Sequence, residues 1–212
     1  MKILFLGDSI TQGVGASSEK FGYVSRVRDA LSAEVINYGV SGTRIGRQTY
    51  MCFTPMFNYD FRLRAEIMEK TCDMVFVFGG TNDYGHGQLH LGDVSSSGEG
   101  TFVGNLKLLI EYLIEKYGKN KLCFILPLRR FCETPVFCKG EGNDEEGASL
   151  AEYVDVMRRI IAGYGIDMID LYENGIPKPE VNTGDEYTTD GVHPNDNGHA
   201  LIARRICDYL AR

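Results

Sequence analysis

The fold is decided by residues 3–10, which read ILFLGDSI, because the chain passes there from an unbroken apolar run to glycine and a hydroxyl. Four consecutive large apolar residues are typical of a strand that is buried on both faces of a sheet. Gly7 and Ser9 suit a tight turn from that strand into a helix. The stretch therefore predicts an interior strand that presents the hydroxyl of Ser9 at its end.

Further short apolar runs alternate along the chain with segments of helical period. The apolar runs cover residues 35–36, 74–78, 122–126 and 166–171. The helical segments cover residues 21–31, 102–113, 150–161 and 202–210. Strands that alternate with helices form parallel sheets, and apolar strands need cover on both faces. We therefore predict a three-layer α/β/α fold with a mainly parallel five-stranded sheet, flavodoxin-like in size.

Length and composition predict one globular domain over residues 1–212. The hydrophobic fraction of 43% and the charged fraction of 24% are ordinary values, and no linker-like stretch divides the chain. The net charge of -7 argues against nucleic-acid binding, because phosphate neutralisation needs a basic face. The chain opens without a leader segment or a long apolar run, so we expect a cytoplasmic protein with no stable membrane insertion. The composition indicates no particular oligomeric state.

The cysteines and histidines do not predict a metal site or a cofactor. No Cys-x-x-Cys pair occurs, and the six cysteines do not alternate with histidines at zinc spacing. Glycines around His86 and His90 predict a loop, so these residues are not expected to share a helix face as ligands. Cys132 and Cys138 lie in one segment and would suit a disulfide in an exported protein, but we expect free thiols.

Polar and small residues follow the predicted strands at the edge where such sheets bind ligands. Ser9 follows the first strand, Gly42 the second and Asn82 the third, while Asp190 and His193 follow the fifth. Each has an ordinary structural interpretation as a cap, a positive-φ glycine or a turn residue. Together they supply a hydroxyl, amide donors and an acid–imidazole pair, which is the set that acyl transfer requires.

The four segments that carry these residues resemble the SGNH hydrolases, also called GDSL-type esterases and lipases. They read GDSI at residues 7–10, NYGVSG at 37–42, GTND at 80–83 and DGVH at 190–193, in the family's order and rough spacing. Ile10 stands where the family has leucine, a change of similar volume. The resemblance spans the whole chain, and the Gly-x-Ser-x-Gly elbow of the α/β-hydrolases is absent around Ser9.

The resemblance implies a role for each matching position. Ser9 would be the nucleophile, His193 the general base and Asp190 the residue that orients the base. The backbone N–H groups of Ser9 and Gly42 and the side chain of Asn82 would form the oxyanion hole. The resemblance thus implies a serine esterase that works through an acyl-enzyme, with neither metal nor cofactor.

The partner that the resemblance implies is a small-molecule ester. Substrates of the family include acetylated carbohydrates, lysophospholipids, thioesters and simple short-chain esters, and some relatives transfer the acyl group to an acceptor other than water. An acyltransferase, a lysophospholipase and a thioesterase therefore remain alternatives. A carbohydrate-binding module on an inactive scaffold is an alternative from another class, which the complete set of catalytic positions disfavours.

Two long segments without helical period, residues 84–101 and 127–147, are expected to frame the crevice as binding loops or lids. They are rich in glycine, serine and charge, which predicts a preference for acetyl or other short acyl groups, because long alkyl chains need apolar walls. Arginines that face the crevice would select a negatively charged substrate, and otherwise they are solvated surface residues. Phe131 would line a shallow acyl pocket or pin its loop. The candidate substrate-binding residues are Arg44, Arg129, Arg130 and Phe131.

Overall fold

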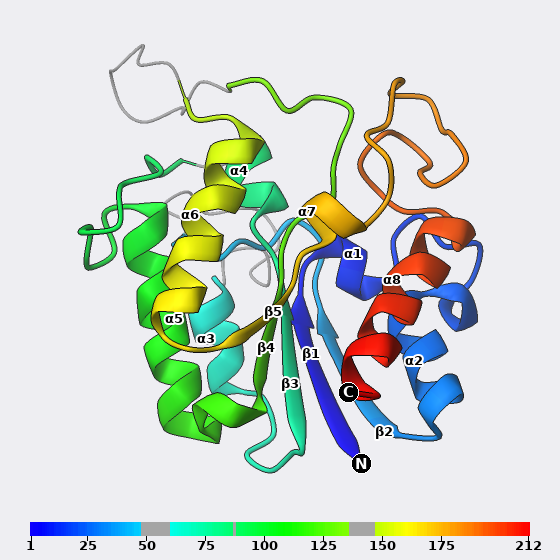
Figure 1. Ribbon diagram of the computed structural model, residues 1–212, viewed down its shortest axis with the longest axis horizontal. Coiled ribbons are helices and arrows are strands. Elements are labelled where there is room, and N and C mark those ends of the chain that lie inside the picture. The colour runs from blue at the N-terminus through cyan, green and yellow to red at the C-terminus, as the bar shows by residue number, and fades with distance from the viewer. Residues whose placement is uncertain (48–59, 87, 136–146) are drawn as a thin grey trace.

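The computed structural model describes residues 1–47, 60–86, 88–135 and 147–212 of the chain. Five strands form one sheet in which all neighbouring strands are parallel (Figure 1). They are β1 (Lys2–Gly7), β2 (Glu34–Gly39), β3 (Met74–Phe78), β4 (Leu122–Ile125) and β5 (Asp167–Ile169), in the order β2-β1-β3-β4-β5. The predicted α/β/α architecture is confirmed, and its strand order is that of flavodoxin-like sheets.

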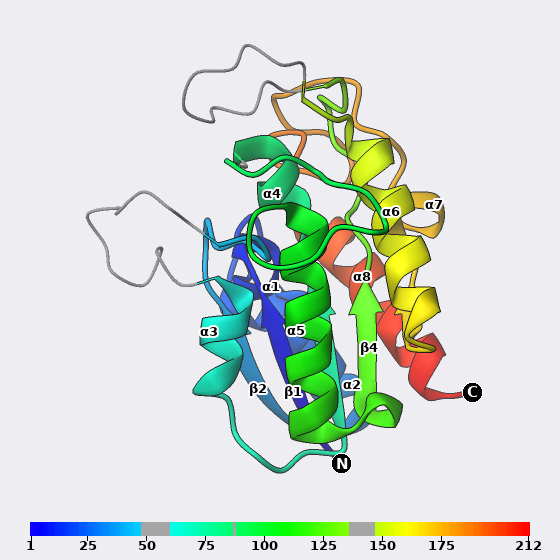
Figure 2. The ribbon, with the colours of Figure 1, turned by 90° about the vertical axis from the view of Figure 1, so that its left-hand side faces the viewer.

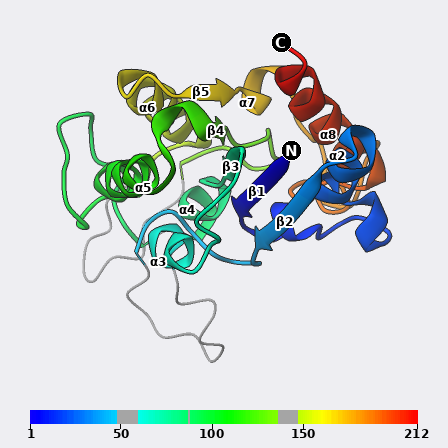
Figure 3. The ribbon, with the colours of Figure 1, turned by 90° about the horizontal axis from the view of Figure 1, so that it is seen from below.

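Helices cover both faces of the sheet. On one face lie α2 (Tyr23–Leu31) and α8 (Asp196–Leu210), and on the other lie α3 (Phe61–Glu66), α5 (Phe102–Tyr117) and α6 (Leu150–Gly163) (Figure 1 and Figure 3). Beyond the carboxyl ends of the strands lie the short helices α1 (Ser9–Gln12), α4 (Thr81–His86) and α7 (Leu171–Asn174) (Figure 1). Short 3-10 turns, η1 (Glu19–Phe21) and η3 (Lys119–Lys121), precede α2 and β4.

The strands divide their side chains between two cores because successive residues of a strand point to opposite faces. Leu4 and Leu6 pack with the residues of α3, α5 and α6. Ile3 and Phe5 pack with those of α2 and α8. Figure 2 shows α5 lying along the sheet between α3 and α6. All four of these β1 residues are fully buried, which explains why the run that opens the chain is uninterrupted.

The ends of the predicted strands differ from the observed ones where local polar contacts intervene. The run predicted over residues 166–171 contains only the short β5, because the Asp170 side chain accepts a hydrogen bond from the Glu173 backbone N–H and starts α7. The weak run at residues 35–36 belongs to the longer β2, which lies at the edge of the sheet and is only half buried. An edge strand needs fewer apolar residues, so its sequence signal is weak.

The prediction of a loop around His86 is wrong for the start of the segment 84–101. Residues 81–86 form α4, and its residues from Thr81 to Tyr84 are buried. This burial outweighs the low helix propensity of Gly85. His90 lies beyond the helix, so the two histidines do not share a helix face. Within the described ranges, no group of histidine, cysteine or acidic residues is arranged to hold a metal ion.

The described cysteines are free thiols. Cys72 and Cys123 are buried, Cys207 is half-buried and Cys132 is exposed. Cys138, the other residue of the disulfide considered above, lies outside the described residues. Of the helices in the part of the chain that the structure describes, none has the length and apolar character needed to cross a membrane.

Candidate active site

The site lies where three strands end in register. Gly7, the last residue of β1, pairs with Gly39 at the end of β2 and with Phe78 at the end of β3. The chain runs from β1 to β2 on one side and then to β3 on the other, so the strand order reverses at β1. Ligands bind at such a reversal in open α/β sheets. The segments that carry Ser9, Gly42 and Asn82 therefore leave the sheet side by side.

Ser9 begins α1 directly after β1 and is almost completely buried. Its Oγ lies 3.0 Å from Nε2 of His193. The preceding residue, Asp8, caps the helix, because its Oδ1 accepts a hydrogen bond of 3.0 Å from the Ile10 backbone N–H. The cap determines where the helix begins, and so it orients the serine at its first position.

Asp190 and His193 lie on one tight turn before α8. Oδ2 of Asp190 lies 2.7 Å from Nδ1 of His193, while its Oδ1 accepts hydrogen bonds from the backbone N–H groups of Val192 (3.0 Å) and His193 (2.7 Å). Gly191 has a φ of 75°, a left-handed conformation that a residue with a side chain adopts only with strain. The turn thus holds the carboxylate and the imidazole together.

The Asp190 carboxylate determines which imidazole nitrogen carries the proton. Partial burial opposes its ionisation, but the hydrogen bonds from the backbone and ring of His193 outweigh this effect and lower the pKa of Asp190. An ionised carboxylate accepts a hydrogen bond from the N–H at Nδ1 of His193, which leaves the lone pair of Nε2 directed at the Ser9 hydroxyl. The sequence pattern of an acid three residues before a histidine does bring the two together.

Asn82, the second residue of α4, is buried and reaches across to the segment that follows β2. Its Nδ2 donates a hydrogen bond of 3.0 Å to the backbone oxygen of Thr43, the residue after Gly42. Gly42 has a φ of 77° and forms the bend of this segment, which we call the Gly42 loop (residues 40–47). One hydrogen bond therefore joins the proposed side-chain donor to the loop of the proposed backbone donor.

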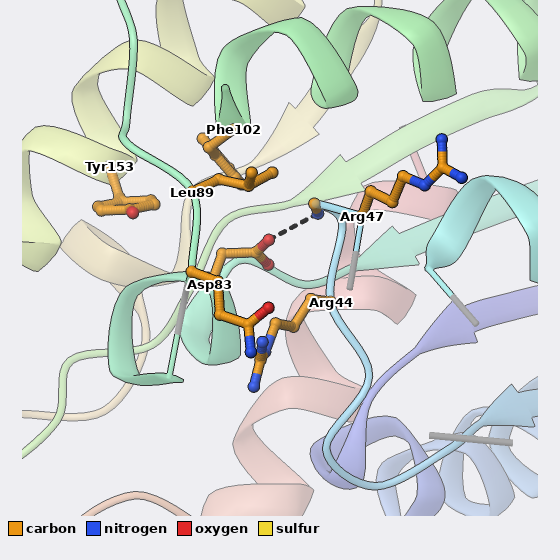
Figure 4. A pocket seen from close by; sticks show the side chains of 8 residues that line it. Arg44, Arg47, Asp83, Leu89, Phe102 and Tyr153 are labelled. Carbon is orange, nitrogen blue, oxygen red and sulfur yellow. Dashed lines mark hydrogen bonds between the residues drawn. The ribbon is translucent and has the colours of Figure 1, made fainter. Parts of the chain in front are cut away.

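Asp83 holds the same loop from the next position of α4. Its two carboxylate oxygens accept hydrogen bonds from the backbone N–H groups of Ile45 (3.0 Å) and Gly46 (2.7 Å), the second being the dashed line in Figure 4. Burial raises the pKa of Asp83 to about 6, although these two hydrogen bonds oppose the shift. The sequence analysis quoted Asp83 only as part of a motif and missed this contact, since no local pattern indicates a bond to a distant loop.

Arg64 is a second residue that the sequence analysis missed. It is buried and donates hydrogen bonds to the backbone oxygen of Gly7 (2.9 Å), to Oγ1 of Thr43 (2.8 Å) and to the backbone oxygen of Tyr38. Burial lowers its pKa to about 10. One guanidinium thus ties the ends of β1 and β2 to the Gly42 loop. It lies on α3, for which the sequence showed no helical period.

The candidate substrate-binding arginines differ in how their charge is balanced. Arg129 forms an ion pair with Glu133, with Nε and Nη2 both within 3.1 Å of its carboxylate oxygens. Arg130 instead lies over the ring of Tyr84 and donates from Nη1 to the backbone oxygen of Thr81 at 3.2 Å, beside the oxyanion-hole candidate Asn82. Unlike Arg129, Arg130 forms no ion pair with a carboxylate in the part of the chain that the structure describes.

Arg44 belongs to the Gly42 loop and lines a small cavity between this loop and helices α5 and α6. The cavity volume is about 10 Å³, room for about one water molecule, so it is too small for a substrate. Figure 4 shows the side chains that line it. The lining residues are Arg44, Gly46, Arg47, Asp83, Gln88, Leu89, Phe102 and Tyr153.

Phe131 lies against the turn of the Asp–His pair. Its backbone N–H donates a hydrogen bond of 2.8 Å to the backbone oxygen of Gly191, while 40% of the residue remains exposed. The backbone of Phe131 therefore holds its loop against the turn, which is one of the two roles expected from the sequence. Part of the residue remains exposed to solvent. Val136 and Phe137, the other apolar residues of this segment, lie outside the described residues.

His199, the other histidine near this end of the chain, is structural. It is fully buried in α8, where Nδ1 accepts a hydrogen bond from the Tyr23 backbone N–H (3.3 Å) and Nε2 lies 3.2 Å from the Val14 backbone oxygen. Burial lowers its pKa to about 4, so the ring is neutral at physiological pH. His199 therefore joins α8 to the start of α2 as a packing residue.

The sequence and the fold both have relatives among known proteins. A family model described as GDSL-like Lipase/Acylhydrolase family matches residues 5–201. The acetylxylan esterase of Xylanibacter ruminicola is 25% identical over 224 residues, which cover 97% of this chain and 42% of that protein. The chain thus spans less than half the length of this curated relative.

Two solved structures show the same fold over nearly their whole length. A protein from Lactobacillus plantarum is 26% identical with a TM-score of 0.79, over 99% of this chain and 96% of that chain. An acetyl xylan esterase, AlAXEase, is 24% identical with a TM-score of 0.67, over 99% of this chain and 100% of that chain. Because its identity to this chain is below 25%, the similarity to AlAXEase concerns the fold alone.

The buried carboxyl of Asp8 makes stability depend on pH. Burial raises the pKa of Asp8 to about 7, opposed by the hydrogen bond from Ile10. The native state therefore binds more protons than the unfolded state between about pH 4 and pH 7, so this contribution to stability is present at low pH and is lost as the pH rises through that window.

We expect Asp8→Asn to be more stable than the unsubstituted protein at pH 8, by roughly 2 kcal/mol, because asparagine accepts the same hydrogen bond without a buried charge. The difference should shrink toward pH 4.5. Urea unfolding of both proteins at the two pH values measures it. A difference that is equal at both pH values would contradict the raised pKa.

Proposed function

This chain belongs to the GDSL-like lipase/acylhydrolase family, and from that premise we propose that it is an ester hydrolase, a serine esterase whose acyl-enzyme forms on Ser9. The observation that carries the proposal is the continuous pair of contacts from Asp190 to His193 (2.7 Å) and from His193 to Ser9 (3.0 Å). These distances are those of a nucleophile, a base and an orienting acid.

In the proposed reaction, Ser9 attacks the ester carbonyl carbon while Nε2 of His193 takes the hydroxyl proton. The tetrahedral intermediate collapses when the same nitrogen gives that proton to the leaving alcohol oxygen, which breaks the ester bond and leaves the acyl group on Ser9. Water then repeats the sequence, with His193 as base, and releases the carboxylic acid. Asp190 stays ionised throughout and stabilises the imidazolium.

The proposed oxyanion hole uses a donor that the fold holds in place beforehand. The side-chain amide of Asn82 has two N–H groups, and the bond to Thr43 occupies one of them. The other is proposed to donate to the developing oxyanion, together with the backbone N–H groups of Ser9 and Gly42. Because Asp83 and Arg64 hold the Gly42 loop independently, the donors need little reorganisation during the reaction.

We propose short-chain acyl esters, and acetyl esters of carbohydrates in particular, as substrates. The similarity to an acetylxylan esterase supports this class, and so does the scarcity of apolar side chains in residues 88–101. Arg130, whose charge no described carboxylate pairs with, is the candidate for selecting a substrate that also carries negative charge.

Ser9→Ala is expected to abolish the hydrolysis of p-nitrophenyl acetate, with a loss of about 10⁶ in kcat, because the acyl-enzyme cannot form. His193→Ala should be comparably severe, and Asp190→Ala milder, since the base remains. A fluorophosphonate probe should label the unsubstituted protein and not the Ser9→Ala variant. Near-normal turnover by folded Ser9→Ala protein would refute the mechanism, and an absence of labelling in the unsubstituted protein would indicate an inactive scaffold.

Asn82→Ala should lower kcat with little change in KM, because the amide is proposed to bind charge that develops only in the transition state. The expected cost is roughly 2.7–4 kcal/mol in the activation free energy. Steady-state kinetics on p-nitrophenyl acetate measure it. A rise in KM at constant kcat would instead make Asn82 a residue that binds the ground state.

The acyl preference is expected to fall with chain length. A series of p-nitrophenyl esters from acetate to octanoate should give the highest kcat/KM for acetate, because each additional buried CH₂ gains about 0.8 kcal/mol only where apolar walls receive it. Quantifying free acid against transferred acyl groups, with added sugar acceptors, separates hydrolysis from acyl transfer. A profile that rises steadily to eight carbons would overturn the preference.

A further inference from the structure

Two exposed apolar residues lie beside the turn that carries Asp190 and His193. Phe131 is 40% exposed and Val181 is 44% exposed, and both flank Gly191 of that turn. Isolated exposed apolar residues are common on proteins, and two of them beside the turn of a proposed catalytic pair are candidates for contact with a substrate. The large apolar residues exposed in the described part of the chain are Met1, Val14, Leu63, Ile67, Val94, Phe131 and Val181.

Both residues are held directly against the turn. A Cβ atom built on Gly191 would lie 2.7 Å from Cβ of Phe131 and 2.7 Å from the backbone oxygen of Val181. The segment of Phe131 is itself rigidly held, since the Glu133 carboxylate accepts hydrogen bonds from the Arg129 side chain and from the backbone N–H of Arg130. The apolar surface thus keeps a constant position relative to the imidazole of His193.

The chemistry decides which half of the ester meets this surface. His193 must return its proton to the leaving alcohol, so the alcohol oxygen lies beside Nε2 in the transition state. The carbonyl oxygen points the opposite way, toward Gly42 and Asn82. The rest of the alcohol leaves from the side of Nε2, and Phe131 and Val181 lie against Gly191 of the turn that carries this imidazole.

We propose that Phe131 and Val181 form a subsite for the leaving alcohol, and that this alcohol carries a ring with an apolar face, either a pyranose or an aryl group. The proposal rests on the proposed esterase function and specifies its substrate class. An aromatic side chain offers a flat apolar surface at low entropic cost, which suits a ring better than a linear chain. The backbone of Val181 meets the same side of Gly191, and 44% of this residue is exposed.

Acetate esters of different alcohols test the subsite, because all of them form the same acetyl-enzyme and differ only in acylation. We expect Phe131→Ala to lower kcat/KM about tenfold for phenyl acetate and for an acetylated methyl xyloside, the scale of one aromatic contact. Methyl acetate should change less than twofold. Dividing each variant's value by that of the unsubstituted protein removes the intrinsic reactivity of each ester.

Matched variants separate this contact from a general effect on folding. Phe131→Tyr should retain the ring selectivity and Phe131→Leu should lose most of it, although leucine still covers Gly191. Val181→Ala should show a smaller loss on ring esters. Val94→Ala is its control, because Val94 is 42% exposed but lies in the segment before α5. Thermal unfolding of each variant confirms that the fold is intact.

Two results would overturn the subsite while leaving the esterase intact. An equal loss on methyl, phenyl and xylosyl acetates would show no contact with the alcohol ring. A loss that grows along a series of methyl esters of longer acids would place Phe131 on the acyl side. Failure of the proposed function looks different, because the Ser9→Ala protein would then remain active on every ester.

Discussion

The parallel register of β1 with β2 and β3 is the constraint on which the site depends. Because Gly7 pairs with both Gly39 and Phe78, the three strands stop at one level, and the segments that follow them begin as neighbours. Arg64 strengthens this alignment, since it binds the backbone oxygens of Gly7 and Tyr38 with one side chain. A one-residue shift of any pair would turn its apolar side chains to the wrong face and separate these segments.

Much of the fold could be predicted because its information is local. Periodicity identified all five strands and the four long helices, and the chain order of strands and helices indicated parallel pairing. The predictions failed where the decisive contact was distant or polar. The short helix α4 forms because Thr81 to Tyr84 are buried, and α7 begins because Asp170 caps it. Neither burial nor capping partners can be read from apolar period alone.

The residues of the proposed site were likewise predicted only in part from the sequence. Ser9, Asp190 and His193 stand in recognisable motifs, and the structure brings them within hydrogen-bonding distance. Asp83 and Arg64, which hold the Gly42 loop, lie on helices that the sequence did not reveal, and their partners are far away in the chain. Reactive residues are therefore easier to identify from a sequence motif than the residues that hold them in place.

The contact between Ser9 and His193 joins residues 184 positions apart. The Tyr23 backbone N–H donates a hydrogen bond to His199, so α8 docks on the start of α2. During synthesis the proposed base is added 184 residues after the proposed nucleophile. A growing chain therefore holds Ser9 without His193 until that later segment has been made, and the contact between them needs both segments to fold together.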